Sequence, residues 1–532
     1  MNSYFDVVVL GSGIAGLATA LAAQRLGLKA VVLEKAEKLG GGTCYSSGLI
    51  WVGSNHLAGV QGIVDPLADV LQYMHFLGGG QEDKHNMDTF VRQAPEALRF
   101  FEACGIPFRL VTGTADHYFN VAPGALRYGR TIEATLIAGS ELGAWQDKVV
   151  RPENALHCVT AEELFASRGR NWDGSFMAER KRQDLRGLGV GLVTHFLRAA
   201  LREGVEVRTG QNVSAVVPGV GVTLDDGGSI RAGAGTVIAT GGYESNPELV
   251  ASFEGIPQWH TCFPDSLRGD GLALGSRAGG AVHVIQNSLQ LFLGLPVPVG
   301  ATGRTEIRLA GIIELTSPHT MVVNERGRRF ADESVFQRVA ARMREFDVDR
   351  HQHANLPCYL VFDSQFTKQY SFGGMPVGEI PPWVQSAPTP EALAHKLGID
   401  ADGLTRSIQR FNGFAENGKD EDFDRHGDLR FPDRPTLGTL REAPYYGVQL
   451  RPTGSGSAGL LTNADAQVLG HDRCPITGLY AIGNAAAKTE LGVGYQAGLT
   501  MASGMTFGLL AARQMAKAKA QQPCAIGPGK SA

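Results

Sequence analysis

The segment of residues 7–34 constrains the fold of this chain more than any other. A short apolar run leads directly into Gly11, Gly13 and Gly16, a helical pattern follows, and a second apolar run ends on Glu34. This order of strand, spaced glycines, helix, strand and terminal acid is typical of a dinucleotide-binding βαβ unit. The sequence therefore predicts a parallel sheet with this unit at its centre.

Each residue of the pattern has a physical role at a phosphate site. Gly11 permits the tight turn, Gly13 lets the backbone approach a pyrophosphate, and Gly16 lets the helix pack closely on the strand. The positive end of the helix faces the phosphates, and Glu34 is placed to accept hydrogen bonds from a ribose. The pattern by itself does not say which dinucleotide binds or which chemistry follows.

Composition limits the class of protein. A chain of 532 residues exceeds one hydrophobic core, so two or more domains are expected. The net charge of −4 and the lack of a Lys/Arg run argue against a nucleic-acid partner. Seven scattered cysteines without a CxxC pair predict reduced thiols in a cytoplasmic protein and no zinc site or other metal. No apolar run reaches the ~18 residues of a transmembrane helix, and no signal peptide is expected.

Further glycine-rich loops predict where the ligand lies. They occupy residues 40–48, 239–242, 268–271 and 483–500, so ligand-binding loops occur near both ends of the chain. The stretch 277–440 between them carries more charge and proline and fewer such loops. We therefore expect an α/β fold with an α+β insert. Residues 1–276 and 441–516 form the Rossmann-like domain, 277–440 the inserted substrate or cap domain, and 517–532 a disordered tail.

Several motifs together resemble one family. They are GSGIAG, GGTCYSSG, RGDG, VNERGRRFADES, RFNGFAENGKDEDFDR, GLYAIGN and GMTFGLLAAR. The chain is similar over residues 5–515 to the superfamily of FAD-dependent fumarate reductases and 3-ketosteroid dehydrogenases, with the closest resemblance to the ketosteroid dehydrogenase-like branch. The resemblance implies a glutathione-reductase-like FAD-binding domain and FAD as the tightly bound dinucleotide.

The resemblance also implies which residues hold FAD. Covalently flavinylated relatives carry a histidine just before the threonine of the GGT loop, and this position is Gly42 here, so non-covalent FAD is predicted. Val213 offers its backbone to the adenine. The residues predicted to bind the cofactor are Gly11, Gly13, Ala15, Gly16, Glu34, Lys35, Gly41, Gly42, Thr43, Ser47, Gly48, Val213, Ala239, Thr240, Gly241, Asp270, Gly483, Asn484, Leu499 and Thr500.

Fumarate reductases, which resemble this chain in architecture, bind a dicarboxylate through a histidine and an arginine in two loops. The corresponding stretches here, 453–459 and 494–498, contain neither residue. Desolvating two carboxylates without cationic donors costs several kcal/mol each. The sequence therefore disfavours a fumarate or succinate enzyme.

Ketosteroid dehydrogenases present a tyrosine hydroxyl and a glycine amide to the ketone oxygen, and Tyr495 and Gly498 match that pair. The resemblance implies α,β-dehydrogenation of a cyclic ketone, from a 3-ketosteroid to a cyclohexanone-type ring, with hydride passing to flavin N5 and the α-proton to a protein base. The usual bases are absent, because Phe336 and Ala497 stand at their positions. Tyr118 is the remaining candidate for base or proton relay, and Phe336 is expected to contact substrate.

Three alternatives stay open at this point. One is a flavin-dependent reductase of an activated C=C bond, and a second is a dehydrogenase of small cyclic ketones whose carboxylate is held by Arg451 or Arg338. The third is a non-catalytic flavin-binding protein. No second glycine fingerprint for NAD(P)H is evident, so the expected electron acceptor is a quinone, a dye-like acceptor or another redox protein.

Overall fold

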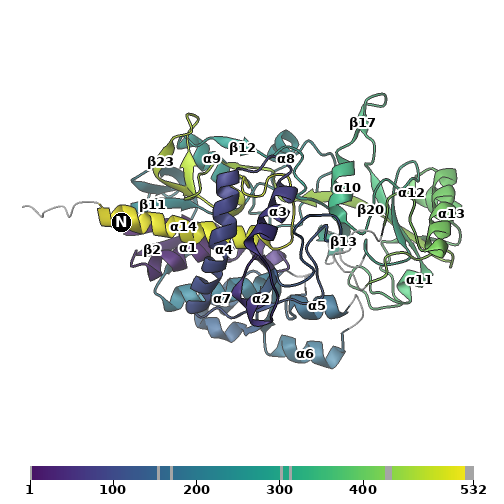
Figure 1. Cartoon of the computed structure of the whole chain (residues 1–532), viewed down its shortest axis with the longest axis horizontal. Coiled ribbons are helices and arrows are strands. Elements are labelled where there is room, and N and C mark those ends of the chain that lie inside the picture. The colour runs from purple at the N-terminus through teal and green to yellow at the C-terminus, as the bar shows by residue number, and fades with distance from the viewer. Residues whose placement is uncertain are drawn as a thin grey trace, which may run out of the picture.

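A computed structural model describes residues 3–152, 156–167, 172–299, 304–310, 314–425 and 434–521. Two bodies lie side by side along its long axis (Figure 1). One contains the glycine-rich segments from both ends of the chain, and the other contains the middle of the chain. The predicted α/β fold with an inserted second domain is confirmed.

The first body is built on a sheet with strand order β22-β23-β11-β1-β2-β8, and β10 and β9 extend it from β11. Strands β1, β2, β8, β11 and β23 are parallel, and β22 runs antiparallel at the edge. The strands of this sheet are β1 (Ser3–Leu10), β2 (Ala30–Leu33), β8 (Glu206–Arg208), β9 (Val213–Val217), β10 (Gly221–Leu224), β11 (Ser229–Ile238), β22 (Gln467–Leu469) and β23 (Pro475–Ala481).

Both faces of this sheet are buried, because alternate side chains of β1 enter different cores. Val7 and Val9 pack with the helices on one face, whereas Val8 and Leu10 pack in a second cluster on the other. This is the pattern expected of a parallel sheet covered on both sides. The covering helices are α1 (Ile14–Arg25), α4 (Lys84–Ala103), α7 (Leu188–Arg202) and α14 (Leu499–Gln521) on the first face and α9 (Asp270–Arg277) on the second.

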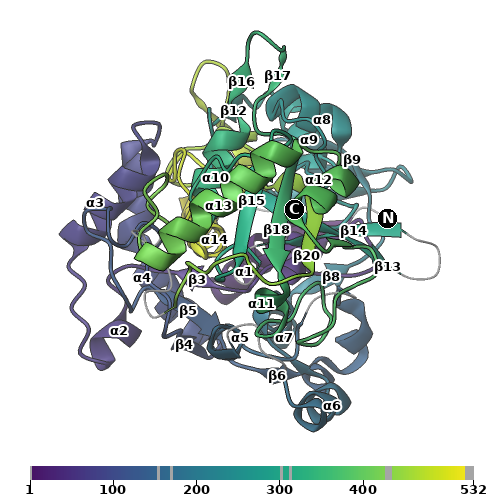
Figure 2. The same ribbon diagram turned by 90° about the vertical axis from the view of Figure 1, so that its right-hand side faces the viewer.

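The second body is an antiparallel sheet with order β14-β13-β20-β18-β15, and β19 also pairs with β20. Figure 2 shows α12 and α13 crossing the near face of this sheet. The elements are β13 (Leu291–Val299), β14 (Arg304–Leu309), β15 (Thr320–Asn324), β18 (Cys358–Asp363), β19 (Gln385–Ala387), β20 (Tyr445–Gly454), α10 (Phe336–Met343), α11 (Ser364–Thr367), α12 (Pro390–Leu397) and α13 (Ala401–Asn417).

Two boundaries differ from the sequence-based expectation. Strand β20 belongs to the second sheet, so a boundary drawn from sheet membership falls after Gly454 rather than at residue 440. Helix α14 continues to Gln521 into the stretch expected to be disordered, because its last residues are good helix formers. The rest of the predicted tail, 522–532, lies outside the described residues.

Short elements complete the chain. They are β3 (Ile50–Trp51), α2 (His56–Val60), α3 (Leu67–Gly78), β4 (Phe108–Leu110), β5 (Thr131–Ala134), β6 (Ile137–Ala138), α5 (Ala161–Ser167), α6 (Gly174–Arg182), β7 (Leu185–Arg186), α8 (Pro247–Phe253), β12 (Val282–Val284), β16 (Phe346–Asp347), β17 (Gln352–His353) and β21 (Ala458–Leu460). Across the described residues, no helix is both long and apolar enough to cross a bilayer.

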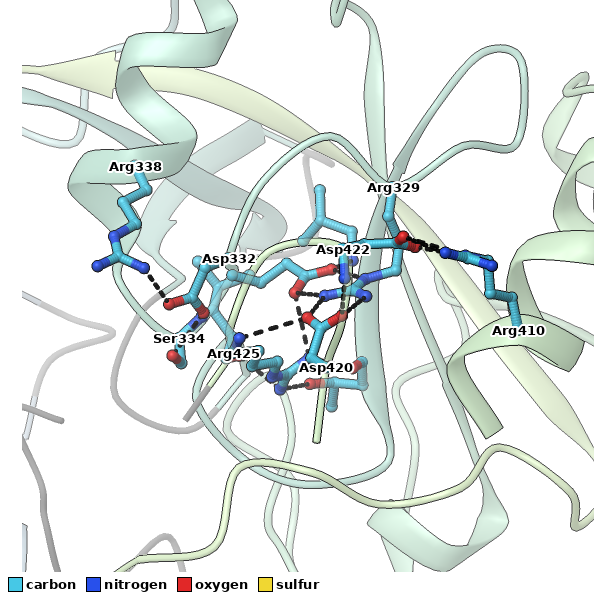
Figure 3. Close-up of polar contacts among 12 residues, drawn as sticks. Arg329, Asp332, Ser334, Arg338, Arg410, Asp420, Asp422 and Arg425 are labelled. Carbon is cyan, nitrogen blue, oxygen red and sulfur yellow. Dashed lines mark hydrogen bonds and ion pairs between the residues drawn. The ribbon is translucent and has the colours of Figure 1, made fainter. Parts of the chain in front are cut away.

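The charged motif after β15 forms a buried ion-pair cluster in the second body (Figure 3). We use this name for Arg329, Asp332, Glu333, Asp420 and Arg425. Arg329 lies between two carboxylates, at 2.8 Å from Glu333 Oε1 and 2.8 Å from Asp420 Oδ2. The Arg425 side chain lies 3.4 Å from Glu333 and donates to the backbone carbonyl of Thr320 at 2.6 Å. The cluster therefore joins β15 to the segment that follows α13.

Candidate active site

One large cavity of about 420 Å³ runs from the carboxyl ends of the parallel strands to the second body. This position, outside the carboxyl edge of a doubly wound sheet, is where such folds bind ligands. The wall at one end comes from the predicted glycine-rich loops. The wall at the other end comes from β13, β14, the start of α10 and the loop before α14.

At the end of the cavity lined by the glycine-rich loops, the floor is formed by backbone. The backbone segments there pack too closely to leave room for side chains. A Cβ atom on Gly11, whose φ is +103°, would lie 2.4 Å from the carbonyl oxygen of Ala239. A Cβ on Gly16 would lie 2.0 Å from the carbonyl oxygen of Gly11. Gly11 lines the cavity, whereas Gly16 lies beneath it and lets α1 approach β1. The roles predicted for these two glycines agree with this geometry.

Glu34 lies at the end of β2 and lines the same end of the cavity. Its Oε2 atom accepts hydrogen bonds from the backbone N–H of Ser12 at 3.0 Å and from the Ser12 hydroxyl at 2.6 Å. Its Oε1 atom accepts from the N–H of Ala36 at 3.0 Å. The carboxylate is thereby held in one orientation beside Val213, which also lines the cavity.

Two further contacts organise the middle of the cavity. The Thr43 hydroxyl accepts a hydrogen bond from the Ile14 N–H at 3.0 Å, at the first turn of α1. Lys35 forms an ion pair with Asp270 at the first turn of α9. The sequence placed Lys35 and Asp270 on the ligand without predicting that they pair with each other.

Most of the residues predicted to bind the cofactor line this cavity. Three do not, and the structure gives each a supporting position: Gly16 within α1 against β1, Gly48 against the backbone of Leu188, and Leu499 in the buried core at the start of α14. The cofactor-site residues that line it are Gly11, Gly13, Ala15, Glu34, Lys35, Gly41, Gly42, Thr43, Ser47, Val213, Ala239, Thr240, Gly241, Asp270, Gly483, Asn484 and Thr500.

Aromatic rings enclose the other end of the cavity. The Tyr495 ring meets Phe292 at a centroid distance of 4.9 Å and Phe336 at 5.5 Å, both edge to face. The His117 ring lies 5.4 Å from that of Tyr495, from behind the cavity wall. Tyr495 and Phe336 were predicted at the site, whereas Phe292 was not, because nothing in the β13 sequence marks it.

Gly498 precedes α14 and lines the cavity together with Tyr495. Its φ is +93°, and a Cβ atom there would lie 2.7 Å from the backbone nitrogen of Trp51, so only glycine fits. Its carbonyl accepts from the Trp51 N–H at 3.1 Å. Among the described backbone groups, no acceptor takes the Gly498 N–H. This N–H is therefore available to a ligand.

Tyr118 does not belong to the lining found among the described residues. Its backbone has a φ of +60°, and its ring packs edge-on to Phe76 at 5.8 Å. The neighbouring His117 N–H donates to the side chain of Gln496 at 2.7 Å, which ties this segment to the loop of Tyr495. Tyr118 thus lies outside the described lining and follows a residue that contacts that loop, and its role as a base stays a prediction.

Two charged residues line the end of the cavity that is enclosed by aromatic rings. Neither was predicted from the sequence. They are Arg308 in β14 and Glu314 shortly after it. Within the described parts of the chain, Arg308 makes no ion pair and Glu314 Oε1 accepts no hydrogen bond. The arginines considered from the sequence lie elsewhere, since Arg338 pairs with Asp332 at 3.1 Å and Arg451 bonds to Gln258 at 3.0 Å.

A buried polar set lies behind the loop that carries Tyr495. Lys488 Nζ donates to the carbonyl of Gly456 at 3.3 Å, and the Ser503 hydroxyl donates to Glu490 at 2.5 Å. Burial lowers the pKa of Lys488 and raises the pKa of Glu490. These groups hold the loop in place and do not line the cavity.

Comparison with known proteins now identifies the fold and cofactor class. Residues 6–498 match the model of the FAD binding domain family. The chain is 33% identical to 4-oxocyclohexanecarboxylate 2-dehydrogenase of Sinomonas cyclohexanicum, over 97% of this chain and 93% of the relative. The chain belongs to this FAD-binding family.

Further relatives place this flavoprotein close to ketosteroid dehydrogenases. It is 31% identical to a 3-oxosteroid 1-dehydrogenase of Mycobacterium tuberculosis, over 96% of this chain and 98% of the relative. The 3-ketosteroid delta1-dehydrogenase of Sterolibacterium denitrificans superposes with a TM-score of 0.86 at 25% identity, covering 97% of this chain and all of that structure. The chain is therefore an FAD-dependent oxidoreductase of the ketosteroid dehydrogenase-like type, as the motifs predicted.

The polar groups of the cavity fit FAD. Thr240 Oγ1 and Asn484 Oδ1 are buried, line the cavity and lack a hydrogen-bond partner in the described structure. Buried polar atoms in native proteins are normally paired, so these two mark positions that a ligand satisfies. These two atoms, the fixed Glu34 carboxylate and the backbone of Gly11 that lines the cavity fit a bound dinucleotide. The cofactor predicted from the sequence is confirmed as FAD.

Proposed function

We propose that this oxidoreductase removes two hydrogens from neighbouring carbons of a cyclic ketone, one of them next to the carbonyl. The observation that carries the proposal is the joint presence of Tyr495 and the Gly498 N–H at the aromatic end of the FAD cavity. A ring ketone can pack against the mutually contacting rings of Phe292 and Phe336 on the cavity side. Its oxygen then meets two donors, the Tyr495 hydroxyl and the Gly498 N–H. FAD, when bound, supplies the acceptor for the hydride that leaves the β-carbon.

Tyr495 and Gly498 make the α-hydrogen acidic. A ketone α-proton leaves only if negative charge developing on the oxygen is stabilised, and donors aimed at that oxygen contribute about 3 kcal/mol each. The rings of Phe292 and Phe336 exclude water from the same space, which strengthens these hydrogen bonds. This chain thus supplies an oxyanion hole.

Arg308 favours a carboxylated ring over a neutral steroid. A guanidinium without a partner among the described carboxylates lines the substrate end of the cavity, where it can meet a carboxylate in a two-pronged geometry. The relative from Sinomonas cyclohexanicum, by its name, acts on 4-oxocyclohexanecarboxylate. We propose the same class of substrate here. Arg308 would bind the substrate carboxylate, the role that the sequence suggested for Arg338 or Arg451.

Other parts of the assignment rest on the sequence. We propose non-covalent FAD, because Gly42 offers no nucleophile at the usual attachment point. The proposed electron acceptor is a quinone, a dye-like compound or a redox protein. A cytoplasmic location is supported by the described cysteines, all of which are free thiols.

Anaerobic bleaching of the flavin tests the proposal. Purified holoenzyme is mixed with 4-oxocyclohexanecarboxylate, with neutral 4-methylcyclohexanone and with a 3-ketosteroid, and flavin absorbance is followed. We expect all cyclic ketones that fit to bleach the flavin, with the carboxylated ring acting at the lowest concentration. Re-oxidation of reduced flavin by the matching enones, without bleaching by ketones, would instead support a C=C reductase.

A further inference from the structure

Glu314 combines deep burial with an unused oxygen atom. The residue is 3% exposed and lines the FAD cavity. Its Oε1 atom is buried and has no hydrogen-bond partner in the part of the chain that the structure describes. No described Lys, Arg or His pairs with its carboxylate.

A buried, ionised carboxylate without hydrogen-bond donors destabilises the folded protein. An ionised group that is removed from water without compensating donors loses several kcal/mol of hydration. The other buried acids of the second body avoid this loss, as Glu333 faces Arg329 at 2.8 Å and Asp420 faces the same guanidinium at 2.8 Å. Buried polar atoms without partners occur at functional sites, where substrate or transition state supplies the missing contact.

Described residues before and after Glu314 are anchored by hydrogen bonds. Before it, the N–H of Ala310 donates to the carbonyl of Leu293 at 2.9 Å, next to Phe292 in the aromatic wall. After it, the carbonyl of Leu315 accepts a hydrogen bond from Arg425 at 3.1 Å. The buried ion-pair cluster shown in Figure 3 thus holds the segment that presents Glu314 to the cavity.

The proposed reaction lacks a base at the expected positions. Phe336 and Ala497 line the cavity where the resemblance places a tyrosine or a serine base, and neither side chain accepts a proton. Tyr118 lies outside the described lining. Of the acids that line the cavity, Glu34 and Asp270 are held by partners at the dinucleotide end. Glu314 is the remaining described carboxylate.

We propose that Glu314 is the catalytic base, a conclusion that rests on the proposed dehydrogenation. The α C–H bond breaks, its proton passes to Glu314 Oε1, and its electron pair forms the new C=C bond as hydride leaves the β-carbon for FAD. A carboxylate is a sufficient base for a ketone α-proton when an oxyanion hole stabilises the developing enolate. Tyr495 and Gly498 provide that hole, so the base and the two hydrogen-bond donors all come from described residues.

Hydrogen exchange isolates this proton transfer from the redox step. Holoenzyme reduced with dithionite under anaerobic conditions is incubated with 4-oxocyclohexanecarboxylate in D₂O, and loss of the α-hydrogens is followed by NMR. We expect wild-type enzyme to catalyse exchange and Glu314→Gln to lower the rate by about 10²–10⁴-fold, the range for loss of a general base. Glu314→Asp should keep part of the rate and its dependence on pH.

Two controls separate a catalytic from a structural role. Glu325→Gln removes an exposed carboxylate that pairs with Arg350 at 3.0 Å, outside the cavity, and should leave exchange unchanged. Glu314→Gln should bind FAD normally and unfold at the same or a higher temperature, because it removes an uncompensated charge. A carboxylate with a structural role would lose stability instead.

The outcomes are distinguishable. Exchange and bleaching at wild-type rates in Glu314→Gln would overturn the assignment of the base and leave the proposed function standing. Wild-type enzyme that neither exchanges nor is bleached by any ketone would overturn the proposed function and the base together. If Glu314→Gln does not fold, Glu314→Asp still decides, since an unchanged rate with the shorter carboxylate contradicts the assignment.

Discussion

The second body places charged side chains in two different settings, the buried ion-pair cluster and the cavity wall, and the two settings differ in how the charges are partnered. In the buried ion-pair cluster, each guanidinium faces carboxylates, and Arg329 and Glu333 are almost inaccessible to solvent. In the cavity, Arg308 and Glu314 line one space without a described partner. Paired charges in this domain hold segments together, whereas unpaired ones face the place where substrate is expected.

The largest effect is expected from breaking a pair in the cluster. Glu333→Gln leaves Arg329 with Asp420 as its remaining carboxylate partner and removes the carboxylate that Arg425 faces in a buried site, so the free energy of unfolding should fall by about 3–5 kcal/mol. Urea unfolding of the holoenzyme measures this. The matched control is Glu203→Gln, which removes an exposed partner of Arg25 and should cost less than about 1 kcal/mol. Equal losses in the two variants would contradict the structural role of the cluster.

Tyr495→Phe tests whether the Tyr495 hydroxyl acts on the substrate in the cavity. The ring contacts with Phe292 and Phe336 remain, so stability should stay close to wild type. Loss of one donor to the ketone oxygen should slow anaerobic bleaching by cyclic ketones about 100-fold, or about 3 kcal/mol. Stopped-flow absorbance measures the rate, and an unchanged rate would remove Tyr495 from the oxyanion hole.

Arg308→Gln should separate charged from neutral substrates. We expect KM for 4-oxocyclohexanecarboxylate to rise about 30-fold, or about 2 kcal/mol, because a charge-assisted hydrogen bond is lost. The KM for 4-methylcyclohexanone and both kcat values should change little. Arg451→Gln, outside the cavity, is the matched control. A similar rise for both ketones would show that Arg308 shapes the cavity and does not bind a carboxylate.

The smallest effect concerns Asp332 in the cluster. Burial raises the pKa of Asp332 to about 6, although Ser334 donates to its carboxylate at 2.6 Å. Because the folded-state pKa lies above the unfolded one, the contribution of Asp332 to stability is complete at low pH and is lost as pH rises through about 6. Between pH 7 and pH 5 the protein should therefore gain about 1 kcal/mol from this group.

Comparison with Asp332→Asn isolates that contribution. The variant keeps an oxygen acceptor for Ser334 and has no titrating group, so the difference in unfolding free energy between wild type and variant should change over this pH range. Urea denaturation at both pH values measures the difference. A difference that stays constant would mean that Asp332 is already ionised, or already protonated, across the range.

At the dinucleotide end, most residues that the sequence predicts to bind FAD line the cavity, and their contacts with the cofactor stay a prediction. This end is built from backbone, and backbone that approaches a ligand requires glycine at fixed spacings, as at Gly11. Close packing of backbone also requires glycine at Gly16 and Gly48. The sequence therefore predicts these two residues as cofactor ligands, although they lie under or beside the cavity. The family, FAD and the two-domain fold followed from such marks and are confirmed.

The substrate end could be predicted only in part. Tyr495 and Phe336 were found through motifs, but Arg308 and Glu314 lie in and after a hairpin whose sequence carries no periodic or turn signal of function. Which carboxylate stays unpaired depends on contacts between distant segments, such as Arg425 with Leu315. Arg338 was proposed as a substrate ligand from its charge alone, whereas in the structure it forms an ion pair with Asp332.

The packing of α14 against α1 has a consequence for how the protein is made. Helix α1 is synthesised long before α14, yet Gly504 lets α14 approach Ala15 so closely that a Cβ atom at Gly504 would lie 3.1 Å from the Ala15 side chain. Until residues 483–521 are synthesised, the first βαβ unit lacks both its covering helix and the loop that completes the cavity. The strands of the antiparallel second body lie between residues 291 and 454, so they are synthesised before the cavity can be complete.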